Sequence, residues 1–312
     1  AAVLTAETDR EAWLEARRGY LGGTDIAAIV GKHKYKTACD VYLEKTGEPV
    51  YDETKTKLAE AGLALEPYIR QWSIREFGWD IKPGRTITHP DHPFLAVNPD
   101  GFVGDDACWE CKTYRFTTKK EWGAEGTDEI PDAYYIQGIW QCGIAGLRRT
   151  LFTACDTGLM TLTPYQAEED PRNFELLVEA GVRFWNEHIV PRIPPALTDK
   201  DGHNIPRLYP KTTGEVLVSS PKEDEIAMRM KELYAQLGPM KKEYESLKES
   251  LKVAIGEAYA IETAVGTFKS TPAPGQVSWK NVACEFSPGN DLIEKFRGAP
   301  FRKLMTPFRG GD

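Results

Sequence analysis

The chain has 312 residues, of which 41% are apolar and 28% are charged, with a formal net charge of −8. This length accommodates one large domain with an appendage, or two modest domains. No apolar run approaches the roughly 18 residues that a membrane-spanning helix needs, so a membrane partner is not expected. The acidic balance argues against indiscriminate binding to nucleic acid, but a DNA enzyme needs positive charge along one groove only.

The N-terminal residues and the cysteines indicate the compartment. The opening AAVLTAETDREAW lacks the basic and apolar segments of a secretory signal, so we expect a cytoplasmic protein. Cys108 and Cys111 form a C-x-x-C pair, which is typical of zinc sites. No second Cys or His pair stands at zinc-finger spacing, and the pattern favours reduced, mostly buried thiols for all six cysteines.

Helices are predicted for the first part of the chain. Thr8 and Glu11 form a capping box that predicts a helix over residues 9–18. Thr24 is expected to cap a short helix with the sequence DIAAIV. A longer amphipathic helix is predicted over residues 55–77, with a kink or a break at its internal proline.

A cluster of strands follows, and helices and strands then alternate. The segments ITHP, FLAVNPDGFV and CWECKTY are short, β-branched or aromatic, and separated by turn residues. Gly104, Asp105 and Asp106 predict a hairpin between the last two. A helix is predicted for DAYYIQGIWQCGIAG, strands for RTLFTACD and LMTLTPY, and a helix for residues 171–188. This order predicts an α/β fold with a central mixed sheet flanked by helices over residues 1–197.

Residues 198–312 are expected to form a C-terminal extension. After a linker rich in Pro, Gly and Asp, Ser220, Pro221 and Glu223 predict a helix start. Apolar residues then recur in alternating steps of four and three from Ile226 to Leu251, with a kink or split expected at Gly238-Pro239. This heptad seam fits either a helix packed on its own domain or a subunit contact. A β-hairpin (GTFKSTPAPGQVSWK) and a basic, aromatic tail are predicted to follow.

The residues that carry chemistry stand between the predicted strands. Residues two apart on a strand face the same side, so Glu110 and Lys112 are expected to project together while Cys111 points away. The predicted hairpin brings Asp100 beside Glu110. Two carboxylates can hold Mg²⁺, with Mn²⁺ as an alternative, and the lysine can stabilise developing negative charge. The backbone carbonyl of Cys111 is a further candidate ligand.

These residues have a plainer interpretation. A Glu-x-Lys pair on a strand is common as a solvated salt bridge, and Pro99-Asp100-Gly101 is also simply a good turn. Trp109 and Cys111 flank the charged residues and predict a buried strand. Buried neighbouring charges are costly unless they are paired or hold a metal, which favours a site.

Several blocks resemble the YqaJ-type viral recombinase family, which is related to phage lambda exonuclease within the PD-(D/E)xK superfamily. They occur in the family's order over roughly residues 12–150: GYLGGTDIAAIVG, YKTACDVYLEKTG, GLALEP, NPDGF, WECKT and YYIQG. The resemblance implies a restriction-endonuclease-like core. It also implies that Asp100 and Glu110 are metal ligands and that Lys112 is the catalytic lysine.

Further roles are implied by the same resemblance. Glu66 corresponds to a helix-borne glutamate that holds metal-bound water, although a helix salt bridge is the alternative. Gln137 corresponds to a glutamine near the site, with Tyr134 one turn earlier. Arg17 and Thr24 have a spacing similar to that of an arginine and a serine that bind a 5′-phosphate, and Arg18 competes with Arg17 for this role.

Physical chemistry supports the phosphate site, because helix N-termini attract phosphate and an arginine completes such a clamp. Asn98, two residues before the aspartate of the motif, is a further candidate phosphate contact. Threonine at position 24, where the family has serine, is a mild departure from the pattern.

Three functions are compatible with these residues. The first is a Mg²⁺-dependent 5′-to-3′ exonuclease that acts on double-stranded DNA ends and leaves 3′ overhangs for recombination. For it, the resemblance implies a homotrimer and a single-strand annealing protein as partner, in the cytoplasm of a bacterial host cell. The second is an endonuclease or nickase on the same core, which needs no terminal-phosphate site. The third is an assembly protein that uses the heptad seam without catalysis.

Overall fold

The computed structural model describes residues 16–47 and 53–271 and divides the chain into two compact units, Ala1–Asn204 and Ile205–Asp312. The first unit contains the central sheet. Its helices are α2 (Gly23–Ile29), α3 (Ala38–Thr46), α4 (Glu53–Phe77), α5 (Asp132–Ala145) and α6 (Pro171–Phe184), with shorter turns η1 (Phe116–Glu121), η2 (Trp185–Ile189) and η3 (Asp199–Asn204). Its strands are β1 (Ile81–Pro83), β2 (Ile87–Thr88), β3 (Ala96–Val97), β4 (Gly101–Val103), β5 (Ala107–Tyr114), β6 (Arg149–Asp156) and β7 (Thr161–Glu168).

The five-stranded sheet has the order β1-β4-β5-β6-β7 and is mixed. Strands β4 and β5 form the predicted hairpin across residues 104–106, with Gly101 opposite Trp109. Strands β5 and β6 are parallel, because α5 carries the chain back across the sheet between them. The remaining pairs are antiparallel. The predicted α/β class with a central mixed sheet is therefore confirmed.

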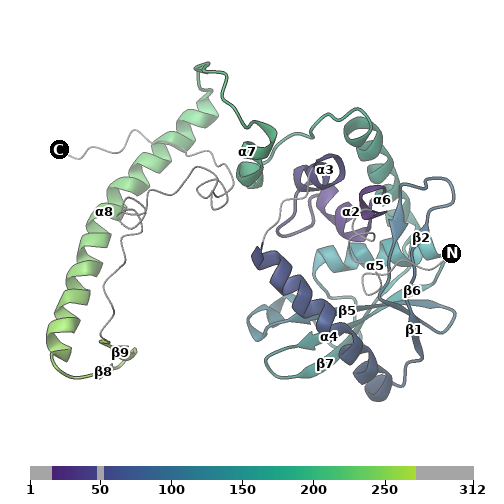
Figure 1. Ribbon diagram of the computed structural model, residues 1–312, viewed down its shortest axis with the longest axis horizontal. Coiled ribbons are helices and arrows are strands. Elements are labelled where there is room, and N and C mark those ends of the chain that lie inside the picture. Colours follow the sequence, from purple (N-terminus) through teal and green to yellow (C-terminus); the bar gives the residue numbers. More distant parts are fainter. Residues whose placement is uncertain (1–15, 48–52, 272–312) are drawn as a thin grey trace, which may run out of the picture. The chain divides into compact units, whose positions relative to one another are not determined.

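Helices cover both faces of this sheet (Figure 1). On one face, Leu65, Ile69 and Ile74 of α4 pack against a cluster that includes Trp109 of β5. On the other face, α5 contributes Tyr134 and Tyr135 to a second apolar cluster. Because alternate residues of a strand face opposite sides, odd-numbered β5 residues such as Trp109 lie under α4 and even-numbered ones face α5.

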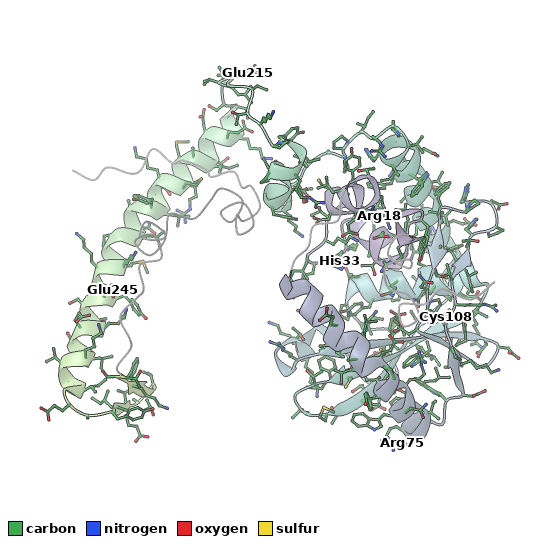
Figure 2. The ribbon with its side chains drawn as sticks, in the orientation of Figure 1. Arg18, His33, Arg75, Cys108, Glu215 and Glu245 are labelled. Atoms are coloured by element: carbon green, nitrogen blue, oxygen red, sulfur yellow. The ribbon has the colours of Figure 1, made fainter. Side chains whose placement is uncertain are left out.

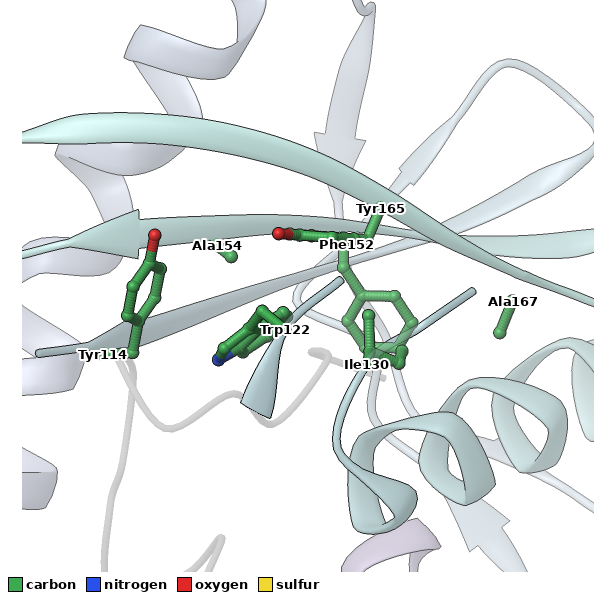
Figure 3. Packing of buried hydrophobic residues seen from close by; sticks show 7 residues of the cluster. All are labelled: Tyr114, Trp122, Ile130, Phe152, Ala154, Tyr165 and Ala167. Carbon is green, nitrogen blue, oxygen red and sulfur yellow. The ribbon is translucent and has the colours of Figure 1, made fainter. Parts of the chain in front are cut away.

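The second cluster is built from aromatic side chains. Figure 3 shows Trp122 between Tyr114 and Ile130, beneath the strand that carries Phe152. The ring centroids of Trp122 and Tyr165 lie 5.0 Å apart in a tilted arrangement. Offset and tilted aromatic pairs are favourable beyond the area that they bury. This cluster anchors the segment between β5 and α5, and so orients the start of α5.

Helix α5 approaches the sheet at a glycine. A Cβ atom added to Gly138 would lie 2.8 Å from the Cβ of Ala167 and 3.0 Å from the ring of Phe152. The helix ends at Gly146, whose φ of 65° is the left-handed conformation that glycine adopts readily. The close approach at Gly138 sets how near the side chains of the neighbouring turns come to β5.

Two predicted helix features in the first unit differ from the structure. Thr24 does not cap α2, since the N-cap is Gly22 and Thr24 lies inside the first turn. Pro67 does not break α4, which runs as one helix from Glu53 to Phe77. The predicted capping box at Thr8 and Glu11 lies outside the described residues. The five described cysteines are free thiols.

The second unit contains α7 (Ile205–Leu208), α8 (Pro221–Ile255) and the hairpin of β8 (Ala260–Thr263) with β9 (Gly266–Lys269). The split expected at Gly238-Pro239 does not occur, because α8 is one continuous helix through both residues. Residues 266–269 pair with residues 260–263, the segment that precedes them. The later half of the predicted hairpin and the basic tail lie outside the described residues. No helix in the described ranges is long and apolar enough to cross a membrane.

We predict that Gly138→Val lowers the free energy of unfolding by about 1–3 kcal/mol, because the added side chain overpacks the contact between α5 and the sheet. Chemical denaturation of the whole chain measures this. Ala133→Val, at a half-buried position of the same helix, is the control and should change the value by less than about 1 kcal/mol. An equal effect of the two substitutions would contradict the close packing at Gly138.

Candidate functional site

The β4–β5 hairpin brings the acidic residues of the motif together. Asp100 directly precedes β4, and its Oδ2 accepts a hydrogen bond of 2.9 Å from the backbone N–H of Cys111. Glu110 and Lys112 share the face of β5 that is turned toward α5, and Cys111 lies on the face covered by α4. The alternation expected from the sequence is therefore what the strand adopts.

The Glu110 carboxylate is nearly inaccessible, with 4% of the residue exposed, and both of its oxygens are occupied. Lys112 Nζ donates to Oε1 at 2.5 Å, and Gln137 Nε2 donates to the same oxygen at 2.7 Å. Gln141 Nε2 donates to Oε2 at 2.7 Å. Buried carboxylates are costly without such partners, so these three donors keep Glu110 in place inside the domain.

Lys112 is held in its charged form. Burial lowers the pKa of its ammonium group, but the carboxylates of Glu110 and Asp100 outweigh this and raise the pKa above the usual range. Its Nζ also lies 5.0 Å from the ring centroid of Tyr134, a favourable cation–π distance. A permanently charged ammonium group at this position can stabilise negative charge that develops on a substrate.

Helix α4 adds a carboxylate and an arginine to the site. Arg70 Nη2 donates to Glu66 Oε1 at 3.0 Å and to the backbone oxygen of Asp100 at 2.9 Å. The guanidinium group also lies over the ring of Trp109. Arg70 thereby ties the glutamate of α4 to the aspartate that precedes β4.

A group of three candidate ligands results. One carboxylate oxygen each of Glu66 and Asp100 and the Sγ of Cys111 lie within 4.8 Å of one another. Burial and the charges of Glu110 and Glu66 raise the pKa of Asp100 well above its usual range. Burial and the carboxylates of Asp100, Glu66 and Glu110 raise the pKa of the Cys111 thiol, so it stays protonated at neutral pH. A divalent cation that prefers oxygen ligands fits this excess of buried negative charge.

This group differs in membership from the predicted ligand pair. Glu110 is not part of it, because its oxygens face Gln137, Gln141 and Lys112 instead of Glu66. The thiol of Cys111, and not only its backbone carbonyl, lies beside the carboxylates. The hairpin alone would bring Asp100 and Glu110 together, and the packing of α4 adds the third carboxylate.

A cavity of about 290 Å³ joins these residues to the predicted phosphate site. Its walls include the charged and amide residues Glu66, Asp100, Glu110, Lys112, Gln137 and Gln141, and also Arg17, Thr24 and Asn98. Arg18, labelled in Figure 2, and Tyr134 are not among the lining residues. Arg17 and not Arg18 therefore faces the space beside the carboxylates.

Asn98 is anchored within this wall. Its Nδ2 donates to the hydroxyl oxygen of Tyr20 at 2.6 Å, and its Oδ1 accepts from the hydroxyl of Thr86. Burial raises the pKa of the Tyr20 hydroxyl, so it stays neutral. The side-chain amide of Asn98 links two neighbouring segments of the wall, which keeps its orientation constant.

A buried charge cluster lies behind Arg17. Asp25 is 1% exposed, and its two oxygens pair with Lys36 Nζ at 2.8 Å and Lys45 Nζ at 2.9 Å. Lys45 Nζ also donates to the backbone oxygen of Arg17 at 2.7 Å, and the N–H of Gly22 donates to Asp25 at 3.1 Å. Asp25 therefore holds the backbone on both sides of the short segment that enters the cavity wall.

The charges around Asp25 determine its protonation state. Burial would raise the pKa of its carboxyl group, but Lys36, Lys45 and Arg17 more than offset this and hold the pKa far below the usual range. The carboxylate is therefore ionised at every pH at which the protein is expected to work.

Sequence reasoning did not identify four lining residues with polar or charged side chains: Tyr20, Arg70, Arg85 and Gln141. Two of them had a signal in the sequence. Gln141 follows Gln137 by four positions on α5, and Arg70 follows Glu66 by four on α4, so each pair shares one face of its helix. Tyr20 and Arg85 lie in segments without a regular period, and only the tertiary structure brings them to the cavity.

The fold and the motif together define a class of domain. A mixed sheet flanked by helices, with an aspartate before one strand of a hairpin and Glu-x-Lys on the next, is the arrangement of the PD-(D/E)xK domains. Residues 12–148 match the YqaJ-like viral recombinase domain. The resemblance inferred from the sequence blocks is therefore confirmed over these residues.

One relative and several solved structures are similar to the chain. The uncharacterized protein YqaJ of Bacillus subtilis (strain 168) is 31% identical over 210 residues, which are 66% of this chain and 64% of that protein. The chain thus matches less than two thirds of that relative's length. An alkaline exonuclease (LHK-Exo) from Laribacter hongkongensis is 22% identical, with 57% of this chain and 91% of that chain covered and a TM-score of 0.45. A phage related exonuclease from Haemophilus somnus 129PT is 13% identical, with 56% and 96% covered and a TM-score of 0.42.

We predict that Asp25→Asn lowers the free energy of unfolding by about 3–5 kcal/mol at pH 7, because buried Lys45 and half-buried Lys36 lose this carboxylate. The folded-state pKa of Asp25 is depressed, so its contribution is present above the ordinary carboxyl pKa of about 3.9 and is lost as the pH falls below it. The difference between wild type and variant should therefore be smaller at pH 3 than at pH 7. Denaturant titrations at both pH values measure it.

Asp132→Asn is the matched control, because its ion pair with Lys32 is exposed on both sides. Exposed pairs contribute less than about 1 kcal/mol. If Asp25→Asn were no more destabilising than Asp132→Asn, the cluster would not hold this wall of the cavity.

Proposed function

We propose that this protein is a metal-dependent deoxyribonuclease that digests double-stranded DNA from its ends in the 5′-to-3′ direction and leaves 3′ single-stranded overhangs for recombination. One observation carries the proposal. A single cavity is lined both by the carboxylates and lysine that phosphodiester hydrolysis needs and by Arg17, which suits a terminal phosphate. The match of residues 12–148 to the YqaJ-like viral recombinase domain supports a role in viral recombination.

The oxygen-rich ligand set favours Mg²⁺, with Mn²⁺ as the alternative. Asp100 and Glu66 would hold the ion, and Glu110 and the backbone carbonyl of Cys111 are the further ligands that the motif implies. When bound, the cation would offset the charge of the scissile phosphate and make a water molecule more acidic. Because Cys111 keeps its proton at neutral pH, oxygen donors dominate the set.

The chain's own residues would orient and stabilise the reaction. Water attacks the scissile phosphorus, the bond to the 3′-oxygen breaks, and a 5′-mononucleotide leaves without a covalent intermediate. Lys112, which is charged and lies between Glu110 and the Tyr134 ring, would stabilise the negative charge that develops on the phosphate oxygens. Gln137 and Gln141 would keep Glu110 oriented through their hydrogen bonds.

The other wall of the cavity would recognise the DNA end. The guanidinium group of Arg17 can bind a terminal 5′-phosphate through charge-assisted hydrogen bonds, and the hydroxyl of Thr24 and the amide of Asn98 can add neutral ones. Tyr134 would act through Lys112, because its ring contacts that ammonium group. An end-specific site of this kind favours an exonuclease over the alternative, an endonuclease or nickase on the same core.

The family resemblance implies further properties. They are a homotrimer, a single-strand annealing protein as partner, and action on double-stranded DNA ends in the cytoplasm of a bacterial host. An acidic protein can still hold DNA if positive charge is concentrated where the DNA lies.

We predict that the protein degrades linear duplex DNA in the presence of Mg²⁺, that EDTA abolishes this, and that Lys112→Ala lowers the rate by at least about 100-fold. A gel assay with a linear duplex and a closed circular duplex measures both activities. Lys120→Ala is the matched control, because this lysine is exposed and does not line the cavity.

The circular substrate separates the two enzymatic proposals. Loss of the linear duplex alone supports the exonuclease, whereas cutting of the circle would establish the endonuclease or nickase instead. Cleavage of neither substrate with Mg²⁺ or Mn²⁺ would refute both, and the non-catalytic assembly role would then remain.

We further predict that wild type digests 5′-phosphorylated ends faster than 5′-hydroxyl ends, and that Arg17→Ala removes this preference. The loss of a charge-assisted hydrogen bond of about 1.5–3 kcal/mol corresponds to a decrease of roughly 10- to 100-fold in kcat/KM on phosphorylated ends. Digestion of 5′-hydroxyl ends should change little.

Arg18→Ala is the matched control, since it removes the neighbouring arginine that does not line the cavity. Equal losses on both kinds of end in Arg17→Ala would show that this residue serves the domain's structure or general DNA binding, and not recognition of the terminal phosphate.

A further inference from the structure

The cavity is lined by cationic side chains that differ in what they contact. They are Arg17, Arg70, Arg85 and Lys112. Lys112 donates to Glu110, and Arg70 donates to Glu66, so both are engaged by carboxylates of the site. Within the residues that the structure describes, no hydrogen bond or ion pair occupies the guanidinium group of Arg85, which is exposed. Its N–H donors are therefore available to a ligand that enters the cavity.

The backbone around Arg85 is fixed beside the acidic motif. A Cβ atom added to Gly84 would overlap the carbonyl oxygen of Pro99, so the two backbones are in direct contact there. On the other side of Arg85, the hydroxyl of Thr86 donates to Oδ1 of Asn98. The chain before and after this arginine is thus tied to the segment that leads into the aspartate of the motif.

The side chain of Arg85 is also oriented. Its guanidinium carbon lies 5.7 Å from the ring centroid of Phe102 on β4, within the range of a cation–π contact. A guanidinium group that lies over a ring keeps its N–H edges free for acceptors in its own plane. Because the group is already partly ordered, a ligand that it binds immobilises less of the side chain.

The charges of the cavity indicate which ligand Arg85 fits. Carboxylates line the same cavity and repel an anionic substrate, so cations near its mouth have to compensate. A guanidinium fork matches the oxygens of a phosphate group. Arg17 lies next to the ion pairs of Asp25, whereas Arg85 lies beside the segment of Asp100. Two arginines on separate segments can contact different phosphates of one DNA strand.

We propose that Arg85 binds a non-terminal phosphate of the DNA backbone, next to the scissile linkage. The choice of DNA as the ligand rests on the proposed function. A phosphate contact of this kind adds affinity and fixes the position of the duplex without reading its sequence. A phosphodiester carries the same charge whether or not the 5′ end is phosphorylated. Arg85 therefore acts equally on both kinds of end, unlike Arg17.

DNA binding by the full chain tests this proposal. The probe is a short duplex closed at one end by a hairpin loop that carries a fluorophore, so that each molecule has a single end. Fluorescence anisotropy is measured with Mg²⁺ in the Lys112→Ala background, which keeps the duplex intact. We expect Arg85→Ala to raise Kd roughly 10-fold, equally for 5′-phosphate and 5′-hydroxyl ends. The slope of log Kd against log salt should fall by about 0.9, the value for one phosphate contact.

Two further variants separate the contact from a structural effect. Arg75→Ala removes another exposed arginine, on α4, that does not line the cavity and is labelled in Figure 2, so it should leave both Kd and the salt slope unchanged. Arg85→Lys retains the charge but not the fork, so it should restore the salt slope and only part of the affinity. Denaturant titration of Arg85→Ala should match the parent, because the side chain is exposed.

Neutral methylphosphonates, introduced one position at a time, locate the phosphate. At one internal position, the substitution should weaken binding by the parent as much as Arg85→Ala does, and should weaken Arg85→Ala no further. The proposal is overturned if Arg85→Ala binds like the parent, if its effect is confined to 5′-phosphorylated ends, or if every methylphosphonate adds to its effect.

The binding readout also separates this proposal from the nuclease. If the parent binds the duplex but the wild-type chain cleaves no DNA, the nuclease proposal fails and the role of Arg85 is still decided by Kd. If the parent does not bind the duplex at all, both proposals are overturned.

Discussion

The structure of the first unit depends on the gathering of buried carboxylates around one strand hairpin. Burial, together with repulsion from Glu110 and Glu66, raises the pKa of Asp100. Lys112 and Arg70 offset part of this charge through direct hydrogen bonds. The surplus of negative charge makes the site suited to a cation, and the sheet, α4 and α5 are arranged to hold it together.

Two groups of residues support the cavity, one around the carboxylates and one around Asp25. Gln137 and Gln141 on α5 orient Glu110, while Arg70 on α4 connects Glu66 to the backbone at Asp100. On the other wall, the buried pairs of Asp25 hold the segment that carries Arg17. Charge pairing therefore determines the positions of the residues around the cavity as much as apolar packing does. Loss of the contacts around the carboxylates, or of those around Asp25, would displace the groups that face a substrate.

Features with a local physical cause could be predicted from the sequence. The period of two along a strand places Glu110 and Lys112 on one face, and the turn residues 104–106 join β4 to β5, so the core of the site was predictable. The heptad steps of α8 were equally visible. Local signals were not sufficient at Pro67, which α4 includes without a break, or at Thr24, which lies inside its helix instead of capping it.

The sequence by itself determined the class of fold, the acidic motif and the family resemblance, because each depends on short-range periodicity or on a pattern of residues in order. Only the tertiary structure decided which side chains meet. Glu66 joins Asp100 because α4 packs across the sheet, and Arg17, not Arg18, lines the cavity next to the buried ion pairs of Asp25. Such contacts join residues far apart in the chain, and no local period specifies them.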